Sequence, residues 1–161
     1  MSYKPIILIF SLALFMASSV AWRFSGVVIS AETIQFFLAF SLCLLAALKF
    51  RDVNTFATSF QKYDLVAQNV NVYSRLYPYG EALAGMGMIV MGPVLIIAGP
   101  ISLIIGSVGA ISVIKAVYID KRNLNCACVG GDSRVPLGFV SLTENLMMIL
   151  MGIWMIRNLF Y

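Results

Sequence analysis

Two cysteines separated by one residue are the feature of this sequence best suited to chemistry. Cys126 and Cys128 lie in the Gly-rich stretch NCACVGG, between two apolar runs. The nearby cations Lys121 and Arg122, together with the start of the next helix, would favour the reactive thiolate form. A one-residue spacer would also close a small, strained disulfide ring that is comparatively easy to reduce. The spacing therefore favours a pair that exchanges disulfides with another protein.

Two other interpretations of the pair stay open. Two thiolates, joined by Cys43 or by one of the 9 methionines, would suit a soft ion such as Cu(I) or Hg(II). The segment could equally be a structural loop without chemistry. A closed zinc site is not expected, because it needs four ligands and the chain has no His. Cys43 by itself is more typical of a small buried side chain, since it lies within an apolar run.

Polar residues within the apolar runs complete the candidate site. A charged side chain in a membrane span is costly, so it normally faces the bundle interior and has a partner. Glu144 is such a residue, Asn145 follows it, and Lys115 is the basic residue best placed to pair with it. The pair would be either a proton or ligand site beside the thiols, or a structural lock. Glu81 is expected near the start of a helix, where the helix dipole favours its carboxylate.

Composition places the chain in a membrane. It has 161 residues, of which 61% are hydrophobic and 11% are charged. Soluble domains are closer to about half apolar and about a quarter charged. We therefore expect an all-α integral membrane protein with one small domain and the lipid bilayer as a partner. No basic stripe with interleaved aromatic residues suggests nucleic acid, and no hydrolase or nucleotide-binding motif suggests another enzyme class.

The apolar runs predict a bundle of about five transmembrane helices, which we expect at residues 5–22, 32–49, 79–98, 101–119 and 138–157. The first run could instead be a cleaved signal peptide. It continues to Trp22, an interfacial anchor type, so we expect an uncleaved helix. Gly99-Pro100 would form the tight turn between the third and fourth helices. Residues 120–137 form the loop that carries the cysteine pair.

Residues 52–70 are expected to form an amphipathic helix at the membrane interface. Polar residues fall mainly between apolar side chains that recur there at three- and four-residue steps. The apolar side chains are Phe56, Phe60, Tyr63, Ala67 and Val70. The same stripe would also allow a helix that packs on the neighbouring spans.

The basic residues predict the orientation of the bundle. With spans that alternate in direction, only Arg23 and Arg157 of the 11 Lys and Arg residues fall on the side opposite the N-terminus. Cytoplasmic loops carry the excess of positive charge in membrane proteins. We therefore expect a bacterial inner-membrane protein whose N-terminus and cysteine loop are cytoplasmic and whose C-terminus is periplasmic.

Several short motifs occur in an order and spacing that together carry a family resemblance. They are LKFRD at 48–52 with Phe56 and Tyr63-Asp64, PYGE at 78–81, CACVGG at 126–131, VPLG at 135–138 and SLTEN at 141–145. Over residues 32–157 the chain resembles the MauE family of methylamine-utilisation membrane proteins, within the wider DoxX-like group. The resemblance implies a four-helix DoxX-like core preceded by an N-terminal helix.

The resemblance also implies a redox-associated role. The family is linked to maturation of the disulfide-rich small subunit of methylamine dehydrogenase, alongside a thioredoxin-like partner. By that analogy Cys126 and Cys128 would be the exchanging pair, and a thioredoxin- or glutaredoxin-like protein would be the partner.

The compartment expected from the family differs from the one expected from the charges. Maturation of the dehydrogenase occurs in the periplasm, whereas the basic residues place the thiols in the cytoplasm. Three resolutions are open: an inverted topology, a cytoplasmic partner, or electron transfer across the membrane. The last would need a thiol or quinone acceptor near the other face, where no cysteine lies, and no cofactor motif is evident.

Overall fold

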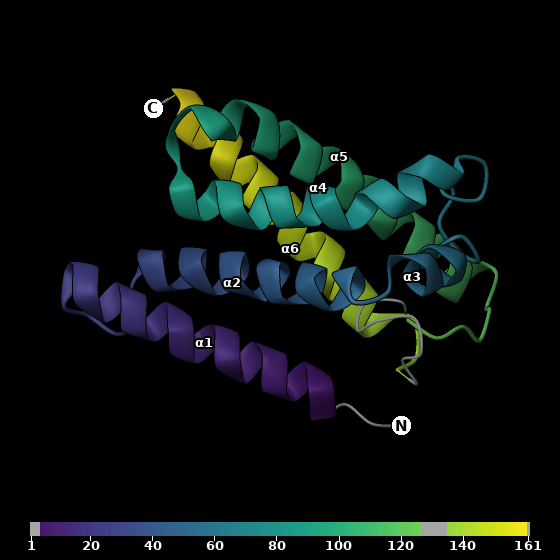
Figure 1. The fold of residues 1–161 in the computed structure, drawn as a ribbon, viewed down its shortest axis with the longest axis horizontal. Coiled ribbons are helices and arrows are strands. Elements are labelled where there is room, and N and C mark those ends of the chain that lie inside the picture. Colours follow the sequence, from purple (N-terminus) through teal and green to yellow (C-terminus); the bar gives the residue numbers. More distant parts are fainter. Residues whose placement is uncertain (1–3, 127–134, 161) are drawn as a thin grey trace.

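The computed structural model describes residues 4–126 and 135–160, and helices make up most of them (Figure 1). The long helices are α1 (Lys4–Ser25), α2 (Ala31–Phe50), α4 (Asn71–Val90), α5 (Leu95–Ile114) and α6 (Phe139–Phe160). Three short elements connect them: α3 (Val53–Phe60), the 3-10 helix η1 (Gly92–Val94) and the π-helix η2 (Lys115–Ile119).

Four segments are long and apolar enough to cross a membrane. They are Lys4–Phe24, Ala31–Phe50, Gly92–Ile119 and Phe139–Phe160. α4 lies among them as a further helix of 20 residues. The chain is therefore an all-α, multi-pass membrane protein, which confirms the fold class predicted from the apolar runs.

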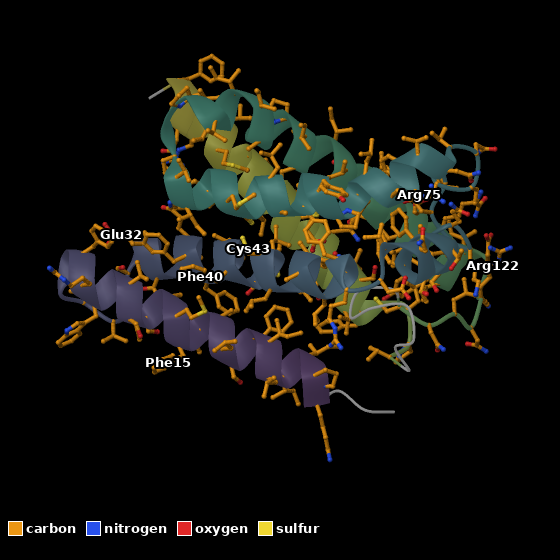
Figure 2. All side chains as sticks on the ribbon, viewed as in Figure 1. Phe15, Glu32, Phe40, Cys43, Arg75 and Arg122 are labelled. Atoms are coloured by element: carbon orange, nitrogen blue, oxygen red, sulfur yellow. The ribbon has the colours of Figure 1, made fainter. Side chains whose placement is uncertain are left out.

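The connections between helices divide the bundle into two ends (Figure 1). The start of α1, α3, η2 and the start of α6 lie at one end, which we call the α3 end. The turns from α1 to α2 and from α4 to α5, and the end of α6, lie at the other. Figure 2 shows Arg75 and Arg122 at the α3 end and Glu32 at the opposite end. The start of α1 and the residues that flank the cysteine pair therefore share one end, as the alternating spans predicted.

Helix α1 lies along α2 at one edge of the bundle, whereas α5 packs closely on α6 at the opposite side. Small residues allow the close approach. Ser102 donates a hydrogen bond to the backbone carbonyl of Met148 at 2.7 Å, and a Cβ built on Gly106 would lie 3.0 Å from the carbonyl oxygen of Asn145. Such contacts between small residues are a common way for membrane helices to associate. They fix α6, which carries Glu144 and Asn145.

The reversal between α4 and α5 lies earlier than the sequence predicted. The predicted turn at Gly99-Pro100 is wrong, because α5 continues through Pro100. The chain turns instead at Met91 and Gly92, whose φ angles are 58° and 73°. Backbone with positive φ reverses the chain directly. A membrane helix tolerates an internal proline, since neighbouring groups can satisfy the backbone carbonyl that the proline leaves free.

The amphipathic segment is shorter than predicted and packs inward. α3 ends at Phe60, and turns follow it. The Asp64 carboxylate stabilises these turns in place of further helix, because its Oδ1 accepts hydrogen bonds from the backbone N–H groups of Val66 and Ala67 at 3.0 and 2.8 Å. The ring of Phe60 lies 4.6 Å from that of Tyr77 on α4. Packing on a neighbouring helix, the alternative that the stripe allowed, is therefore what the structure shows.

Candidate functional site

Three charged side chains meet inside the bundle at the α3 end. The Lys49 ammonium donates a hydrogen bond to Glu81 Oε2 at 2.6 Å and another to Glu144 Oε1. The exposed fractions of the three side chains are 1%, 0% and 4%. Each comes from a different helix, namely α2, α4 and α6. We call Lys49, Glu81 and Glu144 the Glu–Lys–Glu cluster.

The sequence of α2 explains why Lys49 faces inward. On α2, Lys49 follows Leu42, Leu45 and Ala46 by seven, four and three residues, and all three are buried. Residues at this spacing share one face of a helix. Lys49 therefore lies on the buried face of α2, although it is the second-last residue of the helix and Arg51 and Asp52 follow it.

Aromatic rings enclose the ammonium group. Lys49 Nζ lies 5.6 Å from the ring centroid of Phe56 on α3 and 5.4 Å from that of Tyr77 on α4. Both distances are within the range of a cation–π interaction. A cavity of about 10 Å³ adjoins the cluster, and its lining residues are Lys49, Phe56, Phe60, Tyr63, Tyr77, Ser141 and Glu144. This is close to the smallest volume that holds one water molecule.

Asn145 ties the helices together beside the cluster. Its Oδ1 accepts a hydrogen bond from the Tyr77 hydroxyl at 3.1 Å, and its amide nitrogen donates to the carbonyl of Ser141 at 2.7 Å. On the α5 side, a Cβ built on Gly109 would lie 2.0 Å from Asn145 Oδ1. Only glycine therefore leaves room for this amide. The arrangement gives Asn145 a positioning role between α4, α5 and α6.

Lys115 is not the partner of Glu144, so the predicted pairing is wrong. Its side chain is exposed in η2 and lines a surface pocket of about 160 Å³ with Asp120 and Arg122. Both Lys115 and Lys49 lie about one turn from the α3 end, so depth along the helix does not distinguish them. The rotation of each helix about its axis decides which lysine faces Glu144. Lys49 was not selected from the sequence, although its spacing from Leu42 and Leu45 was a usable signal.

Glu81 also differs from the prediction. α4 begins at Asn71 and not at residue 79, so Pro78 lies inside the helix. Glu81 is therefore about three turns from the start of α4, beyond the reach of the terminal helix dipole. Its carboxylate is held by the Lys49 ammonium instead.

Cys43 has a free thiol and lies midway along α2. A Cβ built on Gly85 of α4 would lie 2.7 Å from Cys43 Sγ, so the sulfur occupies the space that this glycine leaves open. The packing role expected for Cys43 from its apolar surroundings fits this contact. In the described part of the chain, no group of three His, Cys, Asp or Glu side chains could hold a metal ion.

The cysteine loop is fixed at its base. The backbone N–H of Cys126 donates to the carbonyl of Val135 at 2.7 Å, and that of Leu137 donates to the carbonyl of Leu124 at 2.7 Å. Cys126 itself is disulfide-bonded and buried, with 1% of its surface exposed. Cys128 lies outside the described residues. The two strands of the loop therefore meet in a short antiparallel pairing that anchors Cys126 to the bundle.

An apolar cavity of about 690 Å³ lies between α1 and the base of the cysteine loop. Its lining residues are Ile6, Ile7, Phe10, Pro136, Leu137, Phe139, Val140 and Thr143. The volume is within the range of small-molecule sites. Because Thr143 supplies the one polar side chain of this lining, an apolar ring or an acyl chain would fit it better than a charged ligand.

Comparison with known proteins gives one match. The sequence model of the family described as Methylamine utilisation protein MauE matches residues 6–157. No curated protein and no solved structure matches the chain.

Proposed function

The chain belongs to the MauE family, which is linked to methylamine utilisation, and from this premise we propose that it exchanges disulfides with a thioredoxin- or glutaredoxin-like protein. Cys126 and Cys128 would be the exchanging pair. The observation that carries the proposal is the disulfide at Cys126 in a loop that Val135 and Leu124 anchor to the end of the bundle.

The exchange transfers two electrons between two dithiols. A thiolate of the reduced partner attacks one sulfur of the Cys126–Cys128 disulfide and forms a mixed disulfide, while the other sulfur leaves as a thiolate and takes a proton. The second thiol of the partner then breaks the mixed disulfide. The partner is oxidised and the Cys126–Cys128 pair is reduced, and the reverse sequence oxidises the pair. Cys43, which packs against α4, takes no part.

Basic side chains at the α3 end support thiolate chemistry. Lys121 and Arg122 precede the pair in the sequence, and Lys115 is exposed at the same end. A positive surface favours the thiolate over the thiol and raises its rate of attack. In this proposal the exposed Lys115 ammonium favours the thiolate form of the loop cysteines. Glu144 binds a proton inside the bundle.

The compartment is part of the proposal. We place the α3 end in the cytoplasm and the C-terminus in the periplasm of a bacterial inner membrane. Lys62, Arg75 and Arg122 are exposed at the α3 end, which supports this orientation. Lys49 does not count toward it, because the ammonium is buried against two carboxylates. A cytoplasmic thioredoxin or glutaredoxin would then reach the loop directly.

The test uses the purified chain in lipid nanodiscs. Reduced thioredoxin should open the disulfide, and maleimide labelling followed by mass spectrometry should locate the new thiols at Cys126 and Cys128. A thioredoxin variant that lacks its second cysteine should be trapped as a mixed disulfide. Cys43→Ser is the matched control and should exchange as fast as the wild type. A pair that stays oxidised while the protein binds Cu(I) tightly would overturn the proposal in favour of a soft-metal site.

A further inference from the structure

We propose that the Glu–Lys–Glu cluster is a proton-binding site that holds one exchangeable proton between its two carboxyl groups. The inference rests on the three buried side chains alone and is independent of the thiol exchange. The ligand of the cluster is a proton, and the cluster lies within the bundle at the α3 end.

The charges of the cluster do not balance without an added proton. Two carboxylates face one ammonium, so the fully ionised cluster carries a net charge of −1. All three side chains are at least 96% buried. An uncompensated charge in such surroundings is strongly unfavourable. One proton on either carboxyl group makes the cluster neutral, and two carboxylates in one buried site commonly share a proton for this reason.

No second cation faces the cluster in the described part of the chain. Every Lys and Arg described there, apart from Lys49, is exposed. The nearest titratable neighbours are phenols, Tyr77 and Tyr73 on α4 and Tyr63 in the turns after α3, together with the Cys43 thiol on α2. α3 contributes the uncharged rings of Phe56 and Phe60, and α6 adds uncharged polar groups. None of these supplies a positive charge.

The carboxyl oxygens of Glu81 and Glu144 independently indicate a bound proton. Glu81 Oε1 and Glu144 Oε2 are buried and have no hydrogen-bond partner among the described residues. Buried polar atoms in native proteins are almost always hydrogen-bonded. The two carboxyl groups are close neighbours, because both bond to the same Lys49 nitrogen. A proton on one of them creates a donor that can bond to the other, either directly or through a water in the adjoining cavity.

The position of the cluster allows the proton to exchange with water. Lys49 is the second-last residue of α2. Glu144 lies five residues after the start of α6, which is about 8 Å along the helix. The cavity beside Glu144 has room for about one water molecule. The path to the aqueous surface at the α3 end is therefore short.

Infrared spectroscopy of the chain in nanodiscs tests the proposal. A protonated carboxyl group shows a C=O stretching band that shifts in D₂O. Asp64 is also buried, and burial raises the pKa of its carboxyl group, so all spectra are taken in an Asp64→Asn background. At neutral pH we expect the band to be present. It should disappear in both Glu81→Gln and Glu144→Gln, because each substitution leaves one carboxylate for one ammonium.

The remaining variants make the outcome decisive. Glu32→Gln removes an exposed carboxyl group and should leave the band unchanged. Lys49→Met leaves two carboxyl groups without a cation, and the band should become about twice as strong. Cys126→Ser/Cys128→Ser should keep the band, so that failure of the thiol exchange and failure of the proton site are separate results. The proposal is overturned if the unsubstituted cluster shows no band, or if either Gln variant retains it. A sodium-dependent rise in thermal stability without the band would assign a metal cation to the site instead.

Discussion

The Glu–Lys–Glu cluster and the cysteine loop lie at the same end of the bundle but are held in different ways. The cluster is formed by side chains from α2, α4 and α6, so it depends on how these three helices pack. Cys126 is positioned by backbone hydrogen bonds to Val135, formed within a short loop. Substitutions in the cluster should therefore change the stability of the whole bundle. Substitutions at the cysteines should change chemistry and leave most of the fold intact.

The largest effect is expected for Lys49→Ala. The substitution leaves two buried carboxyl groups without a cation, and removal of one partner of a buried ion pair typically costs about 3–5 kcal/mol. The free energy of unfolding in nanodiscs or mild detergent measures the loss. Lys115→Ala is the matched control, because its side chain is exposed, and should change the unfolding free energy by less than about 0.5 kcal/mol. Equal losses for the two variants would contradict the role of the cluster.

Gly109→Ala should have the next largest effect. The added methyl group would lie 2.0 Å from Asn145 Oδ1, so α5 and α6 must move apart. Overpacking of this kind typically costs about 1–3 kcal/mol. Truncation of the partner sharpens the test: Asn145→Ala should remove much of the additional cost of Gly109→Ala in a double-mutant cycle. Additive losses would show that the two residues do not meet.

On the loop side, Cys126→Ser/Cys128→Ser should abolish exchange with thioredoxin and cost less than about 2 kcal/mol of stability. A disulfide that closes a short loop removes little chain entropy from the unfolded state. Thermal unfolding and the thiol assay are measured on the same preparation. A variant that unfolds as readily as Lys49→Ala would remove the distinction between the two regions.

Two aspartates near the α3 end should respond to pH in opposite directions. Burial raises the pKa of the Asp64 carboxyl in the folded state, whereas hydrogen bonds from the Thr55 hydroxyl and backbone N–H lower the pKa of Asp52. As pH rises above the unfolded value of about 4, Asp64 lowers stability until its folded pKa is passed, by about 1.4 kcal/mol per unit of difference. Asp52 adds stability above that value and loses it as pH falls through its folded pKa.

The measurement is thermal unfolding as a function of pH for the wild type and two Asn variants. Relative to the wild type, Asp64→Asn should become more stable as pH rises, and Asp52→Asn should become less stable. Slopes of the same sign would show that burial does not govern the titration of Asp64.

Hydropathy and residue type were sufficient for the general identity of this protein. The apolar runs predicted an all-α membrane bundle, and the order of motifs from LKFRD to SLTEN predicted the MauE family; both are confirmed. The sequence also selected Glu144 and Asn145 as polar residues inside a membrane span, and Glu81 as a polar residue near the start of a helix. These inferences succeed because the cost of placing a charge or an exposed backbone in an apolar medium depends on the local sequence.

Only the tertiary structure decided which of these residues meet. Lys49 and Lys115 are equally close to the α3 end, yet Lys49 alone faces Glu81 and Glu144. The chain reversal at Met91 was likewise not predicted, and only the structure decided that α3 packs inward, which the sequence had left as an alternative. Side-chain pairing depends on the rotation and crossing of helices that are far apart in the sequence. Small residues such as Gly85 and Gly109 set those approaches through contacts that no local pattern records.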